Sequence, residues 1–217
     1  MSGPGGKPAD IQARRRGRLF VIAAPSGTGK TSLVRALVKR IPTLAVSISF
    51  TTRDPRPTEQ DGRDYHFVSQ DVFANMARRG EFLEHATVFD NSYSTGRKQV
   101  ESALQHGQDL LLEIDWQGAA QVRRALPEAI SIFILPPSRA SLEQRLRDRA
   151  TDRPEVIARR LKDSVIELSH WHEFDYVVEN DVFDQALAQL EGIIHGRGEA
   201  VRRDRPGLAE FVRKLLD

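Results

Sequence analysis

The stretch that decides the fold spans residues 24–31 and reads Ala24-Pro25-Ser26-Gly27-Thr28-Gly29-Lys30-Thr31. An apolar run from Leu19 to Ala23 precedes it, and a segment with helical apolar spacing follows it. The glycines let successive backbone N–H groups turn toward phosphate oxygens, and a helix start adds partial positive charge. This context predicts a phosphate-binding loop between a strand and a helix, which we call the phosphate loop.

The residue types in the phosphate loop favour a nucleoside triphosphate as ligand. Lys30 would reach the β- and γ-phosphates as a point charge, and the Thr31 hydroxyl would ligate the accompanying Mg²⁺. The strict pattern begins with glycine, whereas this chain has Ala24, which costs little there if its φ is negative. We expect the following residues to bind the phosphates of ATP: Pro25, Ser26, Gly27, Thr28, Gly29, Lys30 and Thr31.

Length and composition narrow the class of protein. The 217 residues suit one α/β domain with inserted subdomains. The chain has no cysteine, which excludes disulfides, thiolate metal sites and cysteine nucleophiles. The formal net charge of +2 is too small to predict general nucleic-acid binding. No apolar run approaches the ~20 residues of a membrane helix, so we expect a cytoplasmic protein without a membrane segment or a nucleic-acid partner.

Apolar spacing predicts helices and strands around the phosphate loop. Residues 1–17 are rich in Gly, Pro and Arg without periodicity, which predicts a disordered basic arm. Helical spacing predicts a helix over residues 31–41 that ends at Pro42. Strict alternation predicts a strand over residues 45–52, and a short helix is expected from residue 71 to residue 79.

Later apolar runs predict the strands of a buried sheet. Residues 110–115 read LLLEID, which is typical of a parallel strand that carries carboxylates at the edge where ligands bind. Residues 131–135 and 176–178 predict two more strands, and a helix is expected from about residue 184. This alternation predicts an α/β fold with a parallel sheet flanked by helices on both faces.

Several ordered motifs make the chain resemble the bacterial guanylate kinases, a family of P-loop nucleoside monophosphate kinases. Together they cover about residues 18–200. Besides the phosphate loop, the matching segments are SFTTRDPR at 49–56, DGRDYHF at 61–67, EFLEHA at 81–86, EIDWQG at 113–118, FILPPS at 133–138, and Asn180-Asp181.

The resemblance implies a P-loop NTPase-type fold with two inserted parts. Residues 51–95 would form a GMP-binding subdomain and residues 141–164 a helical lid. Residues 201–217 are expected to form a basic, helical tail. The core nucleotide-binding domain would then consist of residues 18–50, 96–140 and 165–200.

The resemblance also implies the reaction, a Mg²⁺-dependent transfer of the ATP γ-phosphoryl group to GMP that gives ADP and GDP. Arginines suit the GMP phosphate because their planar fork binds its oxygens bidentately. A carboxylate at Glu84 would accept hydrogen bonds from the adjacent N–H and NH₂ groups of guanine. The residues that the resemblance assigns to GMP are Ser49, Arg53, Arg56, Tyr65, Glu84, Tyr93, Thr95 and Asp115.

The remaining implied roles concern ATP and catalysis. Glu113 would join Thr31 at the metal, through a water molecule, and Asn180 would lie on the adenine side. Closure of the lid would bring arginines to the phosphates and exclude water. The residues implied to be catalytic are Lys30, Arg53, Arg145, Arg149 and Arg160. Ala150 and Glu179 depart from the usual family residues beside the lid arginine and before the asparagine.

Two other functions are weighed against an active guanylate kinase. A guanylate-kinase-like binding module without catalysis typically lacks the phosphate loop, whereas Lys30 and Thr31 are intact here. A P-loop kinase for another small phosphorylated acceptor would not need Glu84 together with Arg53 and Arg56. The sequence therefore favours a kinase that uses ATP and GMP; it carries no prediction of the oligomeric state.

Overall fold

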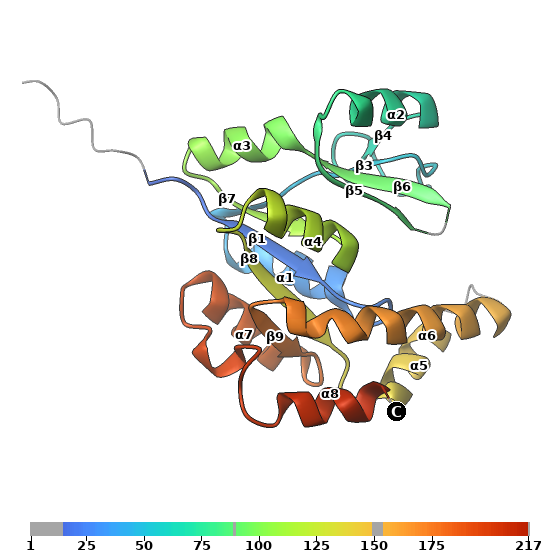
Figure 1. The fold of residues 1–217 in the computed structure, drawn as a ribbon, viewed down its shortest axis with the longest axis vertical. Coiled ribbons are helices and arrows are strands. Elements are labelled where there is room, and N and C mark those ends of the chain that lie inside the picture. Colours follow the sequence, from blue (N-terminus) through green and yellow to red (C-terminus); the bar gives the residue numbers. More distant parts are fainter. Residues whose placement is uncertain (1–14, 89, 149–153, 217) are drawn as a thin grey trace, which may run out of the picture.

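The computed structural model describes residues 15–88, 90–148 and 154–216. Its main sheet has five strands in the order β2-β7-β1-β8-β9, and each neighbouring pair is parallel. The predicted parallel sheet is thereby confirmed (Figure 1). The strands are β1 (Leu19–Ala23), β2 (Leu44–Val46), β7 (Asp109–Glu113), β8 (Ile130–Leu135) and β9 (Tyr176–Glu179).

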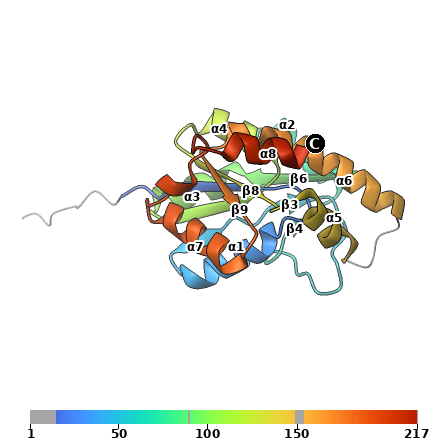
Figure 2. The ribbon, with the colours of Figure 1, turned by 90° about the horizontal axis from the view of Figure 1, so that it is seen from below.

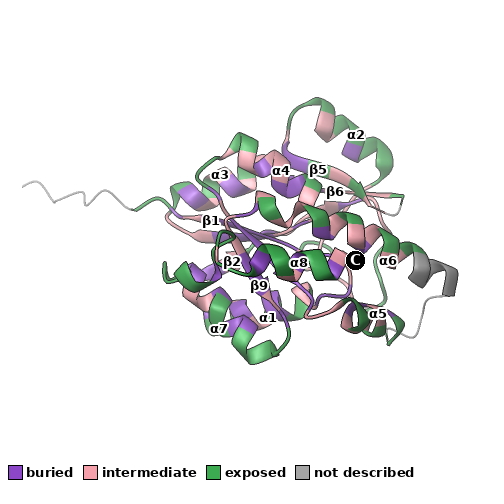
Figure 3. Cartoon of the chain, turned by 60° about the horizontal axis from the view of Figure 1, so that its bottom comes forward, coloured by how far each residue is buried: buried purple, intermediate pink, exposed green. Residues whose placement is uncertain are grey.

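Both faces of the main sheet are apolar because helices cover both. Val21 and Phe133 belong to one hydrophobic cluster, whereas their neighbours Ile22 and Ile132 belong to the cluster on the opposite face. This alternation produces continuous apolar runs in the sequence, as buried parallel strands require. Figure 3 shows buried residues along these strands and on the helix faces that meet them.

The helices form two layers around the main sheet. Helices α4 and α8 lie on one face of the sheet, and α1 and α7 lie on the other (Figure 2). Helix α3 contributes Val100 and Leu104 to the same hydrophobic cluster as α4 and α8. Helices α5 and α6 follow β8 and contribute Leu142, Leu146 and Leu168 to the first cluster. The bounds are α1 (Lys30–Arg40), α3 (Arg97–Gln105), α4 (Trp116–Ala125), α5 (Arg139–Arg147), α6 (Pro154–Leu168), α7 (Phe183–Ile194) and α8 (Leu208–Leu216). None of the helices in the described part of the chain could cross a bilayer, since none is both long and apolar enough.

A second, smaller sheet is inserted between β2 and α3. Its order is β4-β3-β6-β5, with β3 parallel to β4 and antiparallel to β6. Helix α2 (Gln70–Arg78) packs on it through Phe73, whose ring centroid lies 4.7 Å from that of Phe82. The strands are β3 (Phe50–Thr51), β4 (His66–Phe67), β5 (Phe82–Val88) and β6 (Asn91–Gly96).

The single strand predicted over residues 45–52 is wrong. The chain pairs with the main sheet as β2 up to Val46, and the Ser47 N–H still donates to the Leu111 carbonyl at 3.0 Å. It then crosses to the smaller sheet, where β3 begins at Phe50. The alternating sequence pattern continues through the crossing, so periodicity alone could not reveal the break.

Both ends of the described chain make contacts with the core that the sequence did not predict. In the predicted arm, residues 1–14 lie outside the described residues, but the Gly17 N–H donates to the Leu104 carbonyl at 2.8 Å. Arg15 and Arg18 both pair with Asp109, each at 2.7 Å. At the other end, α8 buries Leu208, Val212 and Leu215 in the first hydrophobic cluster. Residues 15–17 therefore pack on the core, and the helix predicted in the C-terminal tail is present as α8 and packs on the core as well.

Candidate active site

The predicted site residues gather around a cavity of about 340 Å³ beyond the carboxyl ends of β1 and β7. The phosphate loop forms one side, and the smaller sheet contributes the opposite side. This is the edge at which α/β sheets bind ligands. Predicted site residues on the cavity wall are Pro25, Ser26, Gly27, Gly29, Lys30, Thr31, Ser49, Tyr65, Glu84, Tyr93, Glu113 and Asp115.

The phosphate loop has the backbone shape that its glycines predict. Gly27 and Gly29 have φ values of 88° and 89°, a left-handed conformation that other residues rarely adopt. The Thr28 hydroxyl donates to the Pro25 carbonyl at 2.8 Å and closes the turn. Among the described non-glycine residues, only Asp90 has a positive φ. Ala24 therefore does not have the positive φ that would make an alanine costly at the first position of the loop.

Two residues predicted to act on ATP contact the phosphate loop from outside the cavity wall. The Asn180 side-chain amide and Arg145 Nη1 both donate to the Thr28 carbonyl, at 2.6 and 3.4 Å. Arg145 Nη2 also donates to the Asn180 carbonyl at 3.0 Å. A Cβ atom on Gly29 would lie 2.6 Å from Asn180 Nδ2, so this glycine is also needed for close packing. Among the described residues, neither Asn180 nor Arg145 belongs to the cavity wall.

The two residues predicted at the metal touch each other. The Thr31 hydroxyl donates to Glu113 Oε1 at 2.5 Å, which joins the first turn of α1 to the end of β7. Both groups offer the oxygen ligands that Mg²⁺ prefers. The described residues contain no cluster of three His, Cys, Asp or Glu side chains that could hold a metal ion. Beside this pair, Lys30 Nζ donates to the Ile114 carbonyl at 2.8 Å.

Glu84 is a buried carboxylate on the cavity wall. Its side chain is 4 % exposed, and its Oε1 accepts a hydrogen bond from the Thr95 hydroxyl at 2.7 Å. Burial raises the pKa of Glu84 to about 7, and the nearby Asp115 carboxylate adds to the shift while Thr95 opposes it. Asp115 caps α4 by accepting from the Gly118 N–H at 2.8 Å. The geometry thus provides a buried acceptor for hydrogen-bond donors of a ligand.

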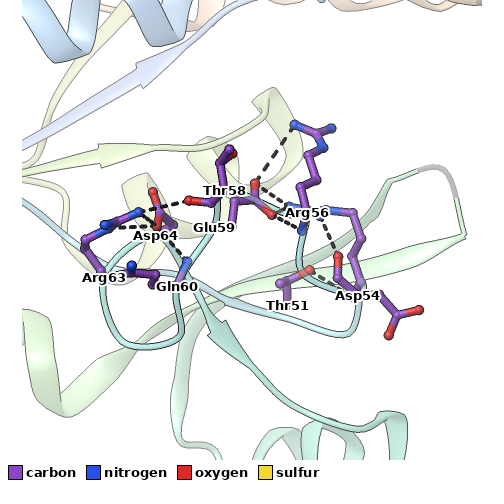
Figure 4. A network of polar contacts seen from close by, with 9 residues as sticks. Thr51, Asp54, Arg56, Thr58, Glu59, Gln60, Arg63 and Asp64 are labelled. Atoms are coloured by element: carbon purple, nitrogen blue, oxygen red, sulfur yellow. Dashed lines mark hydrogen bonds and ion pairs between the residues drawn. The ribbon is translucent and has the colours of Figure 1, made fainter. Parts of the chain in front are cut away.

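Arg53 is held by its own loop. Its Nη2 donates to both carboxylate oxygens of Glu59, at 3.0 and 2.9 Å, and its Nη1 donates to the Asp54 carbonyl at 2.6 Å. The Arg56 N–H also donates to Glu59, at 2.8 Å, within the network of Figure 4. Burial would raise the pKa of Glu59, but the Arg56 N–H and the Arg53 guanidinium lower it below its ordinary value. Glu59 and the Asp54 carbonyl therefore fix the orientation of the Arg53 guanidinium.

Comparison with known proteins identifies the family. The sequence profile described as guanylate kinase matches residues 16–197, which is most of the chain. The chain belongs to the guanylate kinase family. The guanylate kinase of Alkalilimnicola ehrlichii is 52% identical over 200 residues, covering 92% of this chain and 98% of that protein. That of Methylococcus capsulatus is 52% identical over 201 residues, covering 93% and 98%.

A solved structure agrees with this guanylate kinase assignment. The crystal structure of guanylate kinase from Anaplasma phagocytophilum is 32% identical, with a TM-score of 0.70, and the match covers 93% of this chain and 96% of that one. The predicted family, fold class, enzyme class and guanylate kinase function are therefore confirmed. The roles of individual residues stay predictions, because the comparisons name none of them.

Some residues with a predicted role in the guanylate kinase reaction lie away from the cavity wall. Arg56 has 73% of its side chain exposed, and Thr95 is fully buried behind Glu84. Arg160 lies on α6, and Arg149 lies outside the described residues. The cavity wall thus gathers most of the phosphate loop, three of the base-reading candidates and the two tyrosines, whereas the described arginines with predicted roles are not on it.

Three residues of this guanylate kinase matter to the site although the sequence did not single them out. Gly118 packs against Glu84, Glu59 holds Arg53, and Glu167 on α6 lines the cavity. Gly118 is the last residue of the EIDWQG motif at 113–118, where a glycine could have been predicted to allow another group to approach the backbone closely. Glu59 and Glu167 contribute through contacts that only the folded chain reveals.

We expect Gly118→Ala to impair the use of GMP. A Cβ atom at position 118 would lie 2.5 Å from Glu84 Oε2 and 3.3 Å from Asp115 Oδ1, so the Glu84 carboxylate has to move. A displacement of about 1 Å at a recognition group costs up to about 10²-fold. Steady-state kinetics should therefore show kcat/KM for GMP falling about 10- to 100-fold, with KM for ATP unchanged. An unaltered kcat/KM for GMP would contradict the placement of Glu84.

Proposed function

We propose that this chain transfers the γ-phosphoryl group of Mg-ATP to the phosphate of GMP. The observation that carries the proposal is one cavity bounded on one side by the phosphate loop and on the other by the buried carboxylate of Glu84. The loop supplies the anion site for ATP, and Glu84 supplies the acceptor for guanine. Two nucleotides bound in this way would direct their phosphates toward each other.

The phosphate loop would bind ATP through backbone N–H groups at the start of α1. Lys30 adds a positive charge close to the phosphates, where charge develops during transfer. Thr31 and Glu113 would hold Mg²⁺, Glu113 through water. When bound, the ion neutralises phosphate charge and orients the phosphate oxygens.

Glu84 would read the guanine base. Its carboxylate accepts hydrogen bonds from the adjacent N–H and NH₂ groups, while Ser49, Thr95 and Asp115 complete the pocket. Adenine presents an acceptor nitrogen in place of the N–H donor. Sites built on such hydrogen bonds reject an unmatched analogue by ~10⁴-fold or more.

The GMP phosphate would bind between the tyrosines and the arginines of the smaller sheet. The Tyr65 and Tyr93 rings lie 6.1 Å apart, and the Arg53 guanidinium lies 5.5 Å from the Tyr65 ring. Arg53 and Arg56 would bind the phosphate oxygens, and Arg145, Arg149 and Arg160 would approach from the lid at residues 141–164. Residues 51–95 would act as the GMP-binding subdomain. A cytoplasmic location and the absence of a nucleic-acid partner stay predictions.

Glu59 supports this phosphate site by orienting Arg53, so we expect Glu59→Ala to raise KM for GMP. Loss of the bidentate carboxylate frees the arginine side chain, which must then lose entropy when it binds the phosphate. The rise should be about tenfold, with kcat and KM for ATP retained in steady-state assays. A lower KM for GMP would show that Glu59 competes with the phosphate instead of organising its site.

The test of the proposed function is a product assay with purified protein, Mg-ATP and each of GMP, AMP, CMP and UMP. GDP formed with GMP, and no diphosphate formed with the other three, is the expected result. Folded protein that binds GMP without turnover would favour the binding module. Turnover of a different phosphorylated acceptor, with GMP ignored, would favour another P-loop kinase.

A further inference from the structure

Glu167 is a carboxylate in the cavity wall that the proposed function does not use. It lies in the last turn of α6, close to the end of that helix at Leu168. Its Oε2 accepts a hydrogen bond from the Ser26 N–H, at 3.2 Å. An acidic side chain thus holds a backbone N–H of the phosphate loop, a group type that binds anions in such loops.

Helix α6 contacts both polar backbone groups of Ser26. Ser164 lies one turn before Glu167 on the same face of the helix and is fully buried, and its hydroxyl lies 3.5 Å from the Ser26 carbonyl oxygen. The next residue, Gly27, packs closely as well, since a Cβ atom there would lie 3.1 Å from Leu142 and Leu146 of α5. The first half of the phosphate loop is therefore shaped by the helices that follow β8.

The charged groups near Glu167 come from four elements. Lys30 of α1 favours its ionised form, whereas Asp115 at the start of α4 and Asp163 on α6 itself oppose it. Glu113, at the end of β7, lies on the same cavity wall. Burial is the largest influence and raises the pKa of Glu167 to about 7, despite Lys30 and the Ser26 N–H. Near neutral pH this carboxyl group is therefore close to its titration point.

We propose that Glu167 is a positioning residue for the phosphate loop, which holds the Ser26 N–H in the empty site and takes up a proton when the triphosphate of ATP enters. The proposal rests on the proposed function, because it takes the phosphate loop as the ATP site. An ionised Glu167 would repel a triphosphate in the same poorly screened cavity. A protonated Glu167 carries no charge, and its carbonyl oxygen still accepts from Ser26.

Proton uptake makes ATP binding depend on pH in a defined direction. Phosphate charge near Glu167 raises its pKa above the value in the empty site, so bound protein holds more protons than free protein. ATP affinity should therefore fall as pH rises above about 7. The part due to Glu167 should amount to about three- to tenfold between about pH 6 and about pH 8.

The experiment compares Mg-ATP binding by the full chain and by Glu167→Gln, using calorimetry across this pH range in two buffers of different ionisation enthalpy. The glutamine keeps an oxygen for the Ser26 N–H but cannot titrate, and the titration of ATP itself is common to both proteins. Asp163→Asn is the matched control, since Asp163 is a carboxylate on the same helix with 41% of its side chain exposed. Carbon NMR of the glutamate carboxyl groups in the unmodified chain gives a second readout that needs no variant.

The proposal expects proton uptake on ATP binding in the unmodified chain and in Asp163→Asn, and its loss in Glu167→Gln. It also expects the ratio of the dissociation constants of the unmodified chain and Glu167→Gln to rise about three- to tenfold with pH. Equal proton uptake in all three proteins, or a ratio that does not change with pH, would overturn it. So would NMR spectra in which no glutamate titrates at higher pH after ATP is added. A chain that binds ATP with this linkage but makes no GDP would overturn only the proposed function.

Discussion

Glu84→Gln is expected to lower kcat/KM for GMP by about 10²- to 10⁴-fold. The carboxylate can accept from both guanine donors, whereas an amide places its NH₂ group against one of them. The mismatch leaves a donor unpaired in a site that is 4 % exposed, where water cannot replace the lost bond. Steady-state kinetics with varied GMP measure the effect, and KM for ATP should change little.

The same substitution is expected to stabilise the folded protein above neutral pH. The pKa of Glu84 rises from 4.5 to about 7 on folding, so the folded state binds the proton more tightly than the unfolded state. The contribution of this group to stability is present in full below about pH 4.5 and is lost as pH rises through about 7. Glutamine cannot ionise and avoids that loss, which approaches about 3 kcal/mol.

Denaturant unfolding at about pH 5 and about pH 8 tests the direction of this effect. The free energy of unfolding of Glu84→Gln should exceed that of the unmodified chain by more at about pH 8 than at about pH 5. Glu81→Gln serves as a control, because Glu81 precedes the same strand but has 34% of its side chain exposed and pairs with Arg79. GMP kinetics equal to those of the unmodified chain would remove Glu84 from base recognition, whatever the unfolding data show.

Lys30→Met is expected to lower kcat by at least about 10²- to 10³-fold, with the fold retained. The ammonium group is the one loop side chain placed to offset phosphate charge, and Met keeps most of the apolar stem. Among the described residues, the Lys30 ammonium group donates a hydrogen bond only to the Ile114 carbonyl, which lies on the cavity wall where water can replace the donor. The change in stability should therefore stay within about 1 kcal/mol.

The measurement combines turnover, thermal unfolding and GMP binding. Lys39→Met, an exposed substitution in the last turn of the same helix, should leave all three unchanged. GMP affinity should also persist in Lys30→Met, because the base site lies on the smaller sheet. Normal turnover by a folded Lys30→Met protein would refute the assignment of the phosphate loop.

The sequence predicted those parts of the site whose chemistry is local. The phosphate loop needs two left-handed glycines, a lysine and a hydroxyl at fixed spacing, and the folded chain has Gly27 and Gly29 in that conformation. The apolar run ending at Glu113 likewise predicted β7 and the edge where the cavity lies. These features depend on neighbours in sequence, so residue order was enough to predict them.

Other features depend on residues that are distant in sequence. Glu167 meets Ser26 across 141 residues, and nothing in its own segment marks it. Arg145 and Asn180 both donate to the Thr28 carbonyl, a contact that the sequence did not indicate, while their roles at ATP stay predictions. Residue types at the right positions thus predicted where the site lies. The contacts between its groups depend on how α5, α6 and the strands pack, which the sequence does not reveal.

The network around Glu59 has a mechanical consequence. Its hydrogen bonds in Figure 4 join residues 51–64 to one another and to nothing in the main sheet. The segment that bears Arg53 and Arg56 is therefore held in shape by its own hydrogen bonds, whatever its orientation relative to the main sheet. Rotation of the smaller sheet toward the phosphate loop would carry the Arg53 side chain and the Arg56 backbone together, without breaking any of these bonds.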